Sequence, residues 1–306
     1  MNVSRLCFGS LTMGPLQANL SLEEGADLLC YAFQNGINFI DTAEIYGNYE
    51  HIARALSRYK GEVAIATKTY AYTREQAQKS LKSALKTLNR NYIDIFLLHE
   101  QESYLTLQGH RPALEYLVEE KKRGNIRAVG ISCHTVAAVK AAFSFKEISV
   151  IHPILNIRGL GIKDGSLKDM INVLREAKEH GIGIYSMKPL GGGHLQNSSL
   201  ESLSFVRDLS FVDSVAVGLR SFAEIDFALH LFRGEKVPSA VYEQISRKKR
   251  MLSYIPEDCT ECFSCIEACP QKALNWESNR PVVVEDKCIW CGYCGANCPG
   301  FCLRIV

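Results

Sequence analysis

The sequence lacks an excess of charge of either sign. Its 306 residues include 35 Lys and Arg against 33 Asp and Glu, which gives a formal net charge of +2 at pH 7. Proteins that bind a nucleic-acid backbone or an anionic membrane surface carry a positively charged patch. The basic run RKKR at 247–250 is interpreted as a solvated helix face or part of a linker. We therefore expect neither a nucleic acid nor a membrane as a partner.

Long apolar runs are also missing. No segment reaches the roughly 18 consecutive apolar residues of a membrane-spanning helix. The opening stretch, MNVSRLCFGS, has neither the basic segment nor the apolar core of a secretory signal. These two absences predict a cytoplasmic protein.

Two glycine motifs that bind phosphate are absent. No G-x-G-x-x-G follows the first apolar run, which weakens the case for a doubly wound dinucleotide-binding sheet. The glycines of PLGGGH at 189–194 precede no Lys-Ser or Lys-Thr pair, so they are not a Walker loop. We expect them to form a turn between a strand and a loop, near a cofactor.

What the sequence does have is an alternation of short apolar runs with helical patterns. The runs are RLCFGS, INFIDTA, VAIATK, IDIFLLH, IRAVGIS, VIHPILN, IGIYSMK and DSVAVGL. Eight such units in about 230 residues predict an α/β fold, a (β/α)8 TIM barrel over residues 1–234, although periodicity alone leaves an open sheet as an alternative. Capping-box pairs support the helix starts; they are Ser21 with Glu24, Thr73 with Gln76, and Ser221 with Glu224.

Four polar residues follow the second, third and fourth apolar runs, where the active site of a (β/α)8 barrel is built. They are Asp41, Tyr46, Lys68 and His99. Their order and the string DTAEIYG resemble the aldo-keto reductase superfamily over about Leu6 to Leu229, and the resemblance implies that they are its catalytic tetrad. Each residue alone could instead be structural: a buried ion pair, a loop aromatic and a strand-end histidine.

The residue types fit carbonyl reduction. Hydride addition leaves a developing alkoxide, which needs a proton donor within hydrogen-bond reach, and Tyr46 is the donor that we expect. The ammonium of Lys68 should lower the pKa of the Tyr46 phenol. Asp41 should hold Lys68 by a charge-assisted hydrogen bond, and His99 should orient the carbonyl oxygen.

The resemblance also implies NADPH as cofactor. Arg220, and Ser221 at the start of a helix, would contact the nucleotide phosphate. The full set of expected cofactor contacts is Ser132, His152, Met187, Arg220 and Ser221.

Several of these positions depart from the family pattern. Cys133 stands where Asn is usual, His152 where Gln is usual and Met187 where an aromatic is common, while Ala228 takes the place of an adenine-side Asn. These changes leave a flavin open as an alternative, although no flavin fingerprint is present. Cys133 is interpreted as an apolar wall residue at the barrel mouth, in preference to a reactive thiol.

Twelve cysteines could indicate a secreted disulfide scaffold, but eight of them fall between 259 and 298. They repeat the spacing C-x2-C-x2-C-x3-C-P twice, which indicates metal binding rather than disulfides. A zinc ribbon would explain C-x2-C pairs but not four equally placed cysteines with a trailing proline, twice. Cys302, outside the pattern, is interpreted as a packing residue.

The repeated run resembles that of bacterial ferredoxins with two [4Fe-4S] clusters, in which the fourth cysteine ligates the other cluster. One cluster would then be held by Cys259, Cys262, Cys265 and Cys298. The other would be held by Cys288, Cys291, Cys294 and Cys269.

The expected organisation is a barrel over 1–234, a linker or helix over 235–257 and a small ferredoxin-like α+β iron–sulfur domain over 258–306. If mostly helical, the linker could span about 30 Å and return the cysteine-rich domain to the active-site face of the barrel. We expect NADPH-dependent reduction of a small aldehyde or ketone. The alternatives are an electron-transfer protein whose barrel uses a flavin or binds a redox protein partner, and a nucleotide-binding regulatory barrel.

Overall fold

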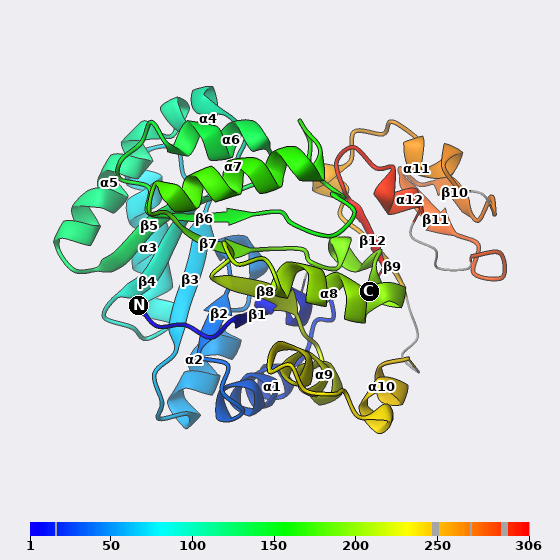
Figure 1. Ribbon diagram of the computed structural model, residues 1–306. Coiled ribbons are helices and arrows are strands. Elements are labelled where there is room, and N and C mark those ends of the chain that lie inside the picture. Colours follow the sequence, from blue (N-terminus) through cyan, green and yellow to red (C-terminus); the bar gives the residue numbers. More distant parts are fainter. Residues whose placement is uncertain (16, 247–250, 270, 289–292, 306) are drawn as a thin grey trace.

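The computed structural model describes residues 1–15, 17–246, 251–269, 271–288 and 293–305 (Figure 1). The basic run at 247–250 lies outside the described residues.

Eight parallel strands form a closed barrel in which each strand pairs with the next and β8 pairs with β1. They are β1 (Leu6–Gly9), β2 (Phe39–Asp41), β3 (Ala64–Thr69), β4 (Ile93–Gln101), β5 (Ile126–Cys133), β6 (Val150–Pro153), β7 (Gly183–Ser186) and β8 (Ser214–Gly218). All eight coincide with the apolar runs of the sequence. The predicted (β/α)8 barrel is therefore confirmed, and pairing of Leu6 with Val215 excludes the open sheet.

Helices surround the barrel strands (Figure 1). They are α1 (Leu22–Gln34), α2 (Tyr49–Arg58), α3 (Arg74–Thr87), α4 (Tyr104–Gly109), α5 (Arg111–Lys122), α6 (Val136–Ala142), α7 (Leu167–Glu179), α8 (Ser199–Arg207) and α9 (Phe222–Phe232), with short 3-10 turns η1 (Ser10–Met13), η2 (Glu44–Tyr46), η3 (Gly191–Gly193) and η4 (Gln196–Ser198). The capping boxes predicted at Ser21 and Thr73 are present: each hydroxyl accepts the backbone N–H of Glu24 or Gln76, and the backbone N–H of the capping residue donates in return to that Glu or Gln side chain.

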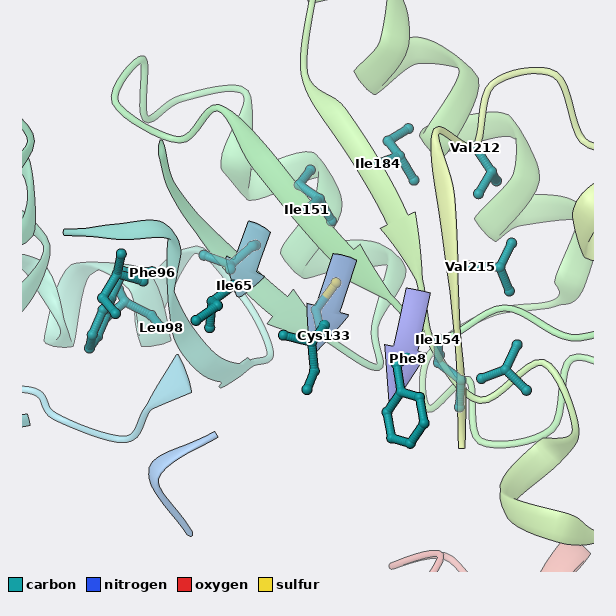
Figure 2. Close-up of a cluster of buried hydrophobic side chains, with 14 of the residues drawn as sticks. Phe8, Ile65, Phe96, Leu98, Cys133, Ile151, Ile154, Ile184, Val212 and Val215 are labelled. Atoms are coloured by element: carbon teal, nitrogen blue, oxygen red, sulfur yellow. The ribbon is translucent and has the colours of Figure 1, made fainter. Parts of the chain in front are cut away.

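Side chains alternate along the strands and so form two apolar layers. Outward-facing residues pack against the helices in the large cluster that Figure 2 shows in part, including Phe8, Ile65 and Phe96. Cys133 belongs to this outer cluster and is completely buried, and burial raises the pKa of its thiol to about 12. It is therefore a packing residue between the barrel and the helices and does not line the barrel mouth.

The inward-facing residues fill the barrel. They are Cys7, Phe39, Ala64, Ala66, Ile95, Leu97, Val150, Tyr185 and Ala216. Since the period is two, the next inward positions after Phe39, Ala66 and Leu97 are those of Asp41, Lys68 and His99. The packing of the barrel interior thus fixes where these three polar side chains emerge.

Beyond the barrel, the chain forms α10 (Ser239–Ser246) and a small unit of paired strands and short helices. Its elements are β9 (Leu252–Tyr254), η5 (Pro256–Asp258), α11 (Ser264–Glu267), β10 (Leu274–Glu277), β11 (Arg280–Val283), α12 (Tyr293–Ala296) and β12 (Leu303–Ile305). β10 pairs with β11, and β9 pairs with β12, both antiparallel. β9 lies in the stretch where a linker is expected, yet it is part of this unit.

The cysteine-rich unit packs against loops at the carboxyl ends of the barrel strands (Figure 1). A Cβ on Gly192 would lie 2.6 Å from the Phe301 ring, so glycine is needed for this close approach. The His194 Nε2–H donates to the Leu303 carbonyl at 3.0 Å. Gly192 of the PLGGGH segment thus serves to dock the C-terminal unit, and the unit lies at the active-site face of the barrel, as the linker length allows. None of the helices that the structure describes is long and apolar enough to cross a bilayer.

Candidate active site

The four predicted catalytic residues meet at the mouth of the barrel. The ammonium of Lys68 donates to Asp41 Oδ2 at 2.8 Å and to the Thr42 carbonyl at 2.8 Å, and lies 3.4 Å from the hydroxyl of Tyr46. Asp41 and Lys68 are almost completely buried, and Tyr46 is half-buried at the end of η2. The His99 ring lies edge-on to that of Tyr46, 6.1 Å between centroids.

The electrostatics of this group keep Lys68 charged and Tyr46 protonated. Burial lowers the pKa of Lys68, but Asp41 and Tyr46 together raise it by more, so that the pKa lies above its ordinary value. Burial raises the pKa of Tyr46, and the opposing effect of Lys68 is smaller. The expected lowering by Lys68 is therefore present but is outweighed, and Tyr46 enters a reaction as a phenol with a proton to give.

His99 is neutral in this environment. Burial, followed by the charge of Lys68, holds its pKa well below the usual range. Its Nδ1 is buried and has no hydrogen-bond partner among the described residues. The ring stacks on Tyr70 with centroids 4.3 Å apart, which fixes its orientation. A neutral imidazole held in this way can donate one N–H to a carbonyl oxygen.

Sequence reasoning missed Tyr185 as a member of this site. Its hydroxyl donates to Asp41 Oδ1 at 3.0 Å, and its ring stacks on His152 with centroids 3.9 Å apart. His152 Nδ1–H donates to the Tyr185 carbonyl at 2.7 Å, while its Nε2 lies 3.5 Å from Asp41 Oδ1. Burial lowers the pKa of His152 to about 4. The alternation of side chains along β7 makes Tyr185 an inward-facing residue, and this is the sequence feature that could have predicted its place in the site.

A cavity of about 500 Å³ extends from Tyr46 and His152 to the start of α9. Its size is within the range of small-molecule sites. Of the expected cofactor contacts, His152, Met187 and Arg220 line it, and so does Ala228.

Ser132 and Ser221 do not line the cavity. The Ser132 hydroxyl is completely buried and accepts the backbone N–H of Glu100 at 2.8 Å. The Ser221 hydroxyl accepts the N–H of Glu224 and caps α9.

The polar groups that line the cavity are placed where a phosphate could bind. At its outer end lie Arg220 and the amino end of α9, where a phosphate is favoured. The Arg220 Nε lies 3.4 Å from Glu224 Oε1, and a phosphate would share the guanidinium with this carboxylate. The backbone of Gly218, which lines the cavity, lies close to the Thr12 side chain, because a Cβ at this position would come within 2.4 Å of it.

Four of the metal-ligand candidates line a second, smaller pocket in the C-terminal unit, although among the described residues no three His, Cys, Asp or Glu side chains lie close enough together to hold a metal ion. Cys259, Cys262, Cys265 and Cys298 all line it, the same four residues that the ferredoxin pattern groups together. The Glu261 N–H donates to the sulfur of Cys259 at 3.4 Å. Amide donors of this kind stabilise thiolates that bind an iron–sulfur cluster.

The second set of cysteines is described in part. Cys269, Cys288 and Cys294 lie in the described residues, while Cys291 lies outside them. The Ala273 N–H donates to the sulfur of Cys269 at 3.2 Å. Cys302 also lines the smaller pocket of the first four cysteines, with its sulfur 3.1 Å from that of Cys298.

Comparison with protein families gives two matches. The model described as "Aldo/keto reductase family" matches residues 5–231. The model described as "4Fe-4S dicluster domain" matches residues 251–299.

Curated relatives match part of the chain. A Glycine max protein named "Probable aldo-keto reductase 1" is 29% identical over 210 residues, which cover 62% of this chain and 57% of that protein. L-galactose dehydrogenase of Arabidopsis thaliana is 26% identical over 207 residues, 64% of each chain. The chain therefore spans less than two thirds of the length of these relatives.

Solved structures agree on the fold. A Pseudomonas aeruginosa protein assigned to the aldo-keto reductases superimposes with a TM-score of 0.62 at 25% identity, covering 81% of this chain and 92% of its own. The holo form of a Bacillus halodurans aldo-keto reductase gives a TM-score of 0.64 at 18% identity with the same coverage, a likeness of fold alone.

Proposed function

The chain belongs to the aldo/keto reductase family, and on that premise we propose that it reduces a small aldehyde or ketone with NADPH. The observation that carries the proposal is the contact of Lys68 with both Asp41 and the Tyr46 hydroxyl at the inner end of the large cavity. An ammonium beside a protonated phenol is the arrangement needed to donate a proton to a developing alkoxide.

Each residue of the tetrad has a distinct task in this proposal. Tyr46 donates the proton to the carbonyl oxygen, and Lys68 stabilises the phenolate that remains. Asp41 holds the ammonium in place, aided by the hydroxyl of Tyr185. Neutral His99 donates a hydrogen bond to the same carbonyl oxygen. When bound, the nicotinamide supplies the hydride.

A panel of simple aldehydes with NADPH under anaerobic conditions tests this function. We expect NADPH oxidation that depends on the aldehyde and yields the alcohol in equal amount. Binding of NADPH without turnover of any aldehyde would instead support a barrel that serves as a nucleotide-binding regulatory unit.

Arg220→Ala is expected to weaken NADPH binding about 10- to 100-fold and NADH binding much less, because only NADPH carries the additional phosphate that a guanidinium can bind by charge-assisted bonds. Fluorescence titration with both nucleotides measures the difference. Arg175→Ala, at a residue outside the cavity, is the control and should leave both affinities unchanged. An equal loss of both nucleotides in Arg220→Ala would assign Arg220 a structural role.

We also propose that the C-terminal unit holds two [4Fe-4S] clusters, the first on the four cysteines of the smaller pocket. The second would be held by Cys269, Cys288 and Cys294 together with Cys291. Iron and acid-labile sulfide in the amounts of two clusters per chain are the expected result of analysis of the anaerobically purified protein.

The clusters are expected to take no part in carbonyl turnover by NADPH, because a nicotinamide gives two electrons together whereas each cluster, when bound, accepts one. The test uses protein with chemically reduced clusters, freed of excess reductant and without NADPH. Mixing it with an accepted aldehyde should yield no alcohol. Alcohol formed in proportion to cluster reoxidation would contradict this separation and make the clusters an electron source for the barrel.

One observation favours keeping a second candidate function. Leu303 lines the smaller pocket and the adjacent Arg304 lines the large cavity, so one short strand lies between the two. This adjacency would suit an electron-transfer protein whose barrel holds a flavin or faces a redox partner. Flavin absorbance that persists after the clusters are extracted would favour this candidate over NADPH-dependent reduction.

A further inference from the structure

Two basic side chains line the large cavity near the tetrad and have no task in the proposed reaction. Lys188 follows β7, and Arg304 lies on β12 of the C-terminal unit. Arg304 is only 7% exposed, although it carries a guanidinium that stays charged in proteins. Burial, and after it the charge of Arg304, lowers the pKa of Lys188 to about 7. The two cations therefore destabilise each other in the absence of a counter-charge.

Arg304 has no side-chain hydrogen bond or ion pair with any residue that the structure describes, and its Nε is buried without a partner. The carboxylates that favour its charge are Asp258 and Glu100, but neither comes within ion-pair distance in the described chain. Glu100 is already engaged, since it accepts the Tyr70 hydroxyl at 2.8 Å. A buried cation without a partner is unfavourable, and an anion in the cavity would offset that cost.

Lys188 is also held toward the cavity. Its Nζ contacts His134 Nε2 at 2.9 Å and lies 5.1 Å from the centre of the Phe301 ring. Its backbone is in the left-handed region, with φ of 55°, which is uncommon for a residue other than glycine, asparagine or aspartate. His134 cannot supply a negative counter-charge, because an imidazole is either neutral or positive, and burial, followed by Lys188, holds its pKa well below the usual range and so keeps it neutral.

The acids that line the cavity do not neutralise this pair. Asp41 is bonded to Lys68 at 2.8 Å, and Glu224 lies at the far end beside Arg220. Among the residues that line the cavity, the charge left at the tetrad end is therefore positive. Arg304 and Tyr46 line the same cavity, so the guanidinium faces the space in which the reacting group lies.

We propose that Arg304 and Lys188 form an anion subsite next to the tetrad, and that the substrate is a carbonyl compound that also bears a carboxylate. The inference rests on the proposed carbonyl reduction. A planar guanidinium can bind a carboxylate through two parallel N–H bonds, while the ammonium adds a point charge. The C-terminal unit thus supplies one wall of the substrate site, and the close approach at Gly192 brings Arg304 into place.

Binding of non-reducible anions tests the subsite without requiring turnover. Oxamate and benzoate are titrated calorimetrically into the cluster-loaded protein saturated with NADP⁺, and benzamide serves as the neutral counterpart of benzoate. Arg304→Met should weaken the binding of at least one anion about 10- to 100-fold and change benzamide binding by less than about twofold. Arg304→Lys should retain an intermediate affinity, because lysine keeps the positive charge but lacks the two parallel N–H donors of the guanidinium.

Two controls separate the subsite from damage to the fold. Arg280→Met removes an exposed arginine of the same C-terminal unit and should leave anion affinity unchanged. Iron content and cluster absorbance of Arg304→Met should equal those of the wild type. Lys188→Met should reproduce the loss of anion affinity, since it alters a residue of the barrel and not of the C-terminal unit.

Turnover provides the second arm, with 4-formylbenzoate and pyruvate each compared with its methyl ester. The ratio of kcat/KM for acid over ester should fall about 10- to 100-fold in Arg304→Met. Absence of anion binding in the wild type, or equal affinity in Arg304→Met, would overturn the subsite. A matching loss of NADPH affinity would overturn it too, by assigning Arg304 to a cofactor phosphate. Anion binding that depends on Arg304, found without any NADPH oxidation, would support the subsite. It would contradict only the proposed carbonyl reduction.

Discussion

Tyr46→Phe is expected to lower the kcat of carbonyl reduction about 100- to 10,000-fold, the contribution typical of a positioned general acid. The substitution keeps the aromatic ring and removes only the hydroxyl, which lies 3.4 Å from Lys68. NADPH affinity should therefore stay within about twofold of the wild type, so that the loss is confined to the chemical step. Steady-state kinetics together with a nucleotide titration measure both quantities.

Tyr72→Phe is the matched control, because Tyr72 is exposed and does not line the cavity. It should retain full activity. Near-normal turnover by Tyr46→Phe would show that another group supplies the proton and would remove the basis for the tetrad.

Asp41→Asn and Lys68→Met are each expected to destabilise the protein by about 3–5 kcal/mol, because each leaves one buried charge without its partner. The side chain of Lys68 is 0% exposed and that of Asp41 is 6% exposed. Either variant can relieve part of the cost by a change of protonation. The double variant, which removes both charges, should recover most of the loss.

Urea unfolding measured by circular dichroism compares the three variants with the wild type. Glu115→Gln is the control, since it breaks an exposed ion pair with Arg111 and should cost no more than about 1 kcal/mol. Two results would contradict a tightly coupled buried pair. One is a single variant as stable as the wild type; the other is a double variant whose free energy of unfolding is no higher than that of the less stable single variant.

The sequence was sufficient for the barrel and for the positions of the tetrad. Near-continuous apolar runs predicted every barrel strand, and the position of Asp41, Lys68 and His99 at the ends of three of these runs predicted that they lie at the mouth. Cys298 and the first three cysteines of the run line one pocket, and their assignment to one cluster stays a prediction. These features depend on local pattern and spacing, which a sequence shows directly.

Features that depend on tertiary packing were not predictable in the same way. The hydrogen bond from Tyr185 to Asp41 joins residues 144 positions apart. Arg304 enters the cavity only because the C-terminal unit docks on the barrel. The direction of the Tyr46 pKa shift results from burial exceeding the effect of Lys68, a balance that residue types alone do not give.

The most direct test of the proposed reaction follows the hydrogen that is transferred. NADPH carrying deuterium at C4 of the nicotinamide is incubated anaerobically with the cluster-loaded protein and 4-formylbenzoate, and the alcohol is examined by mass spectrometry. Direct transfer in the cavity beside Tyr46 predicts one deuterium on the former carbonyl carbon of the product. The experiment is done with the label on each face of the nicotinamide in turn. Alcohol that carries only hydrogen from solvent in both cases would contradict direct transfer and show that the electrons reach the carbonyl by another route.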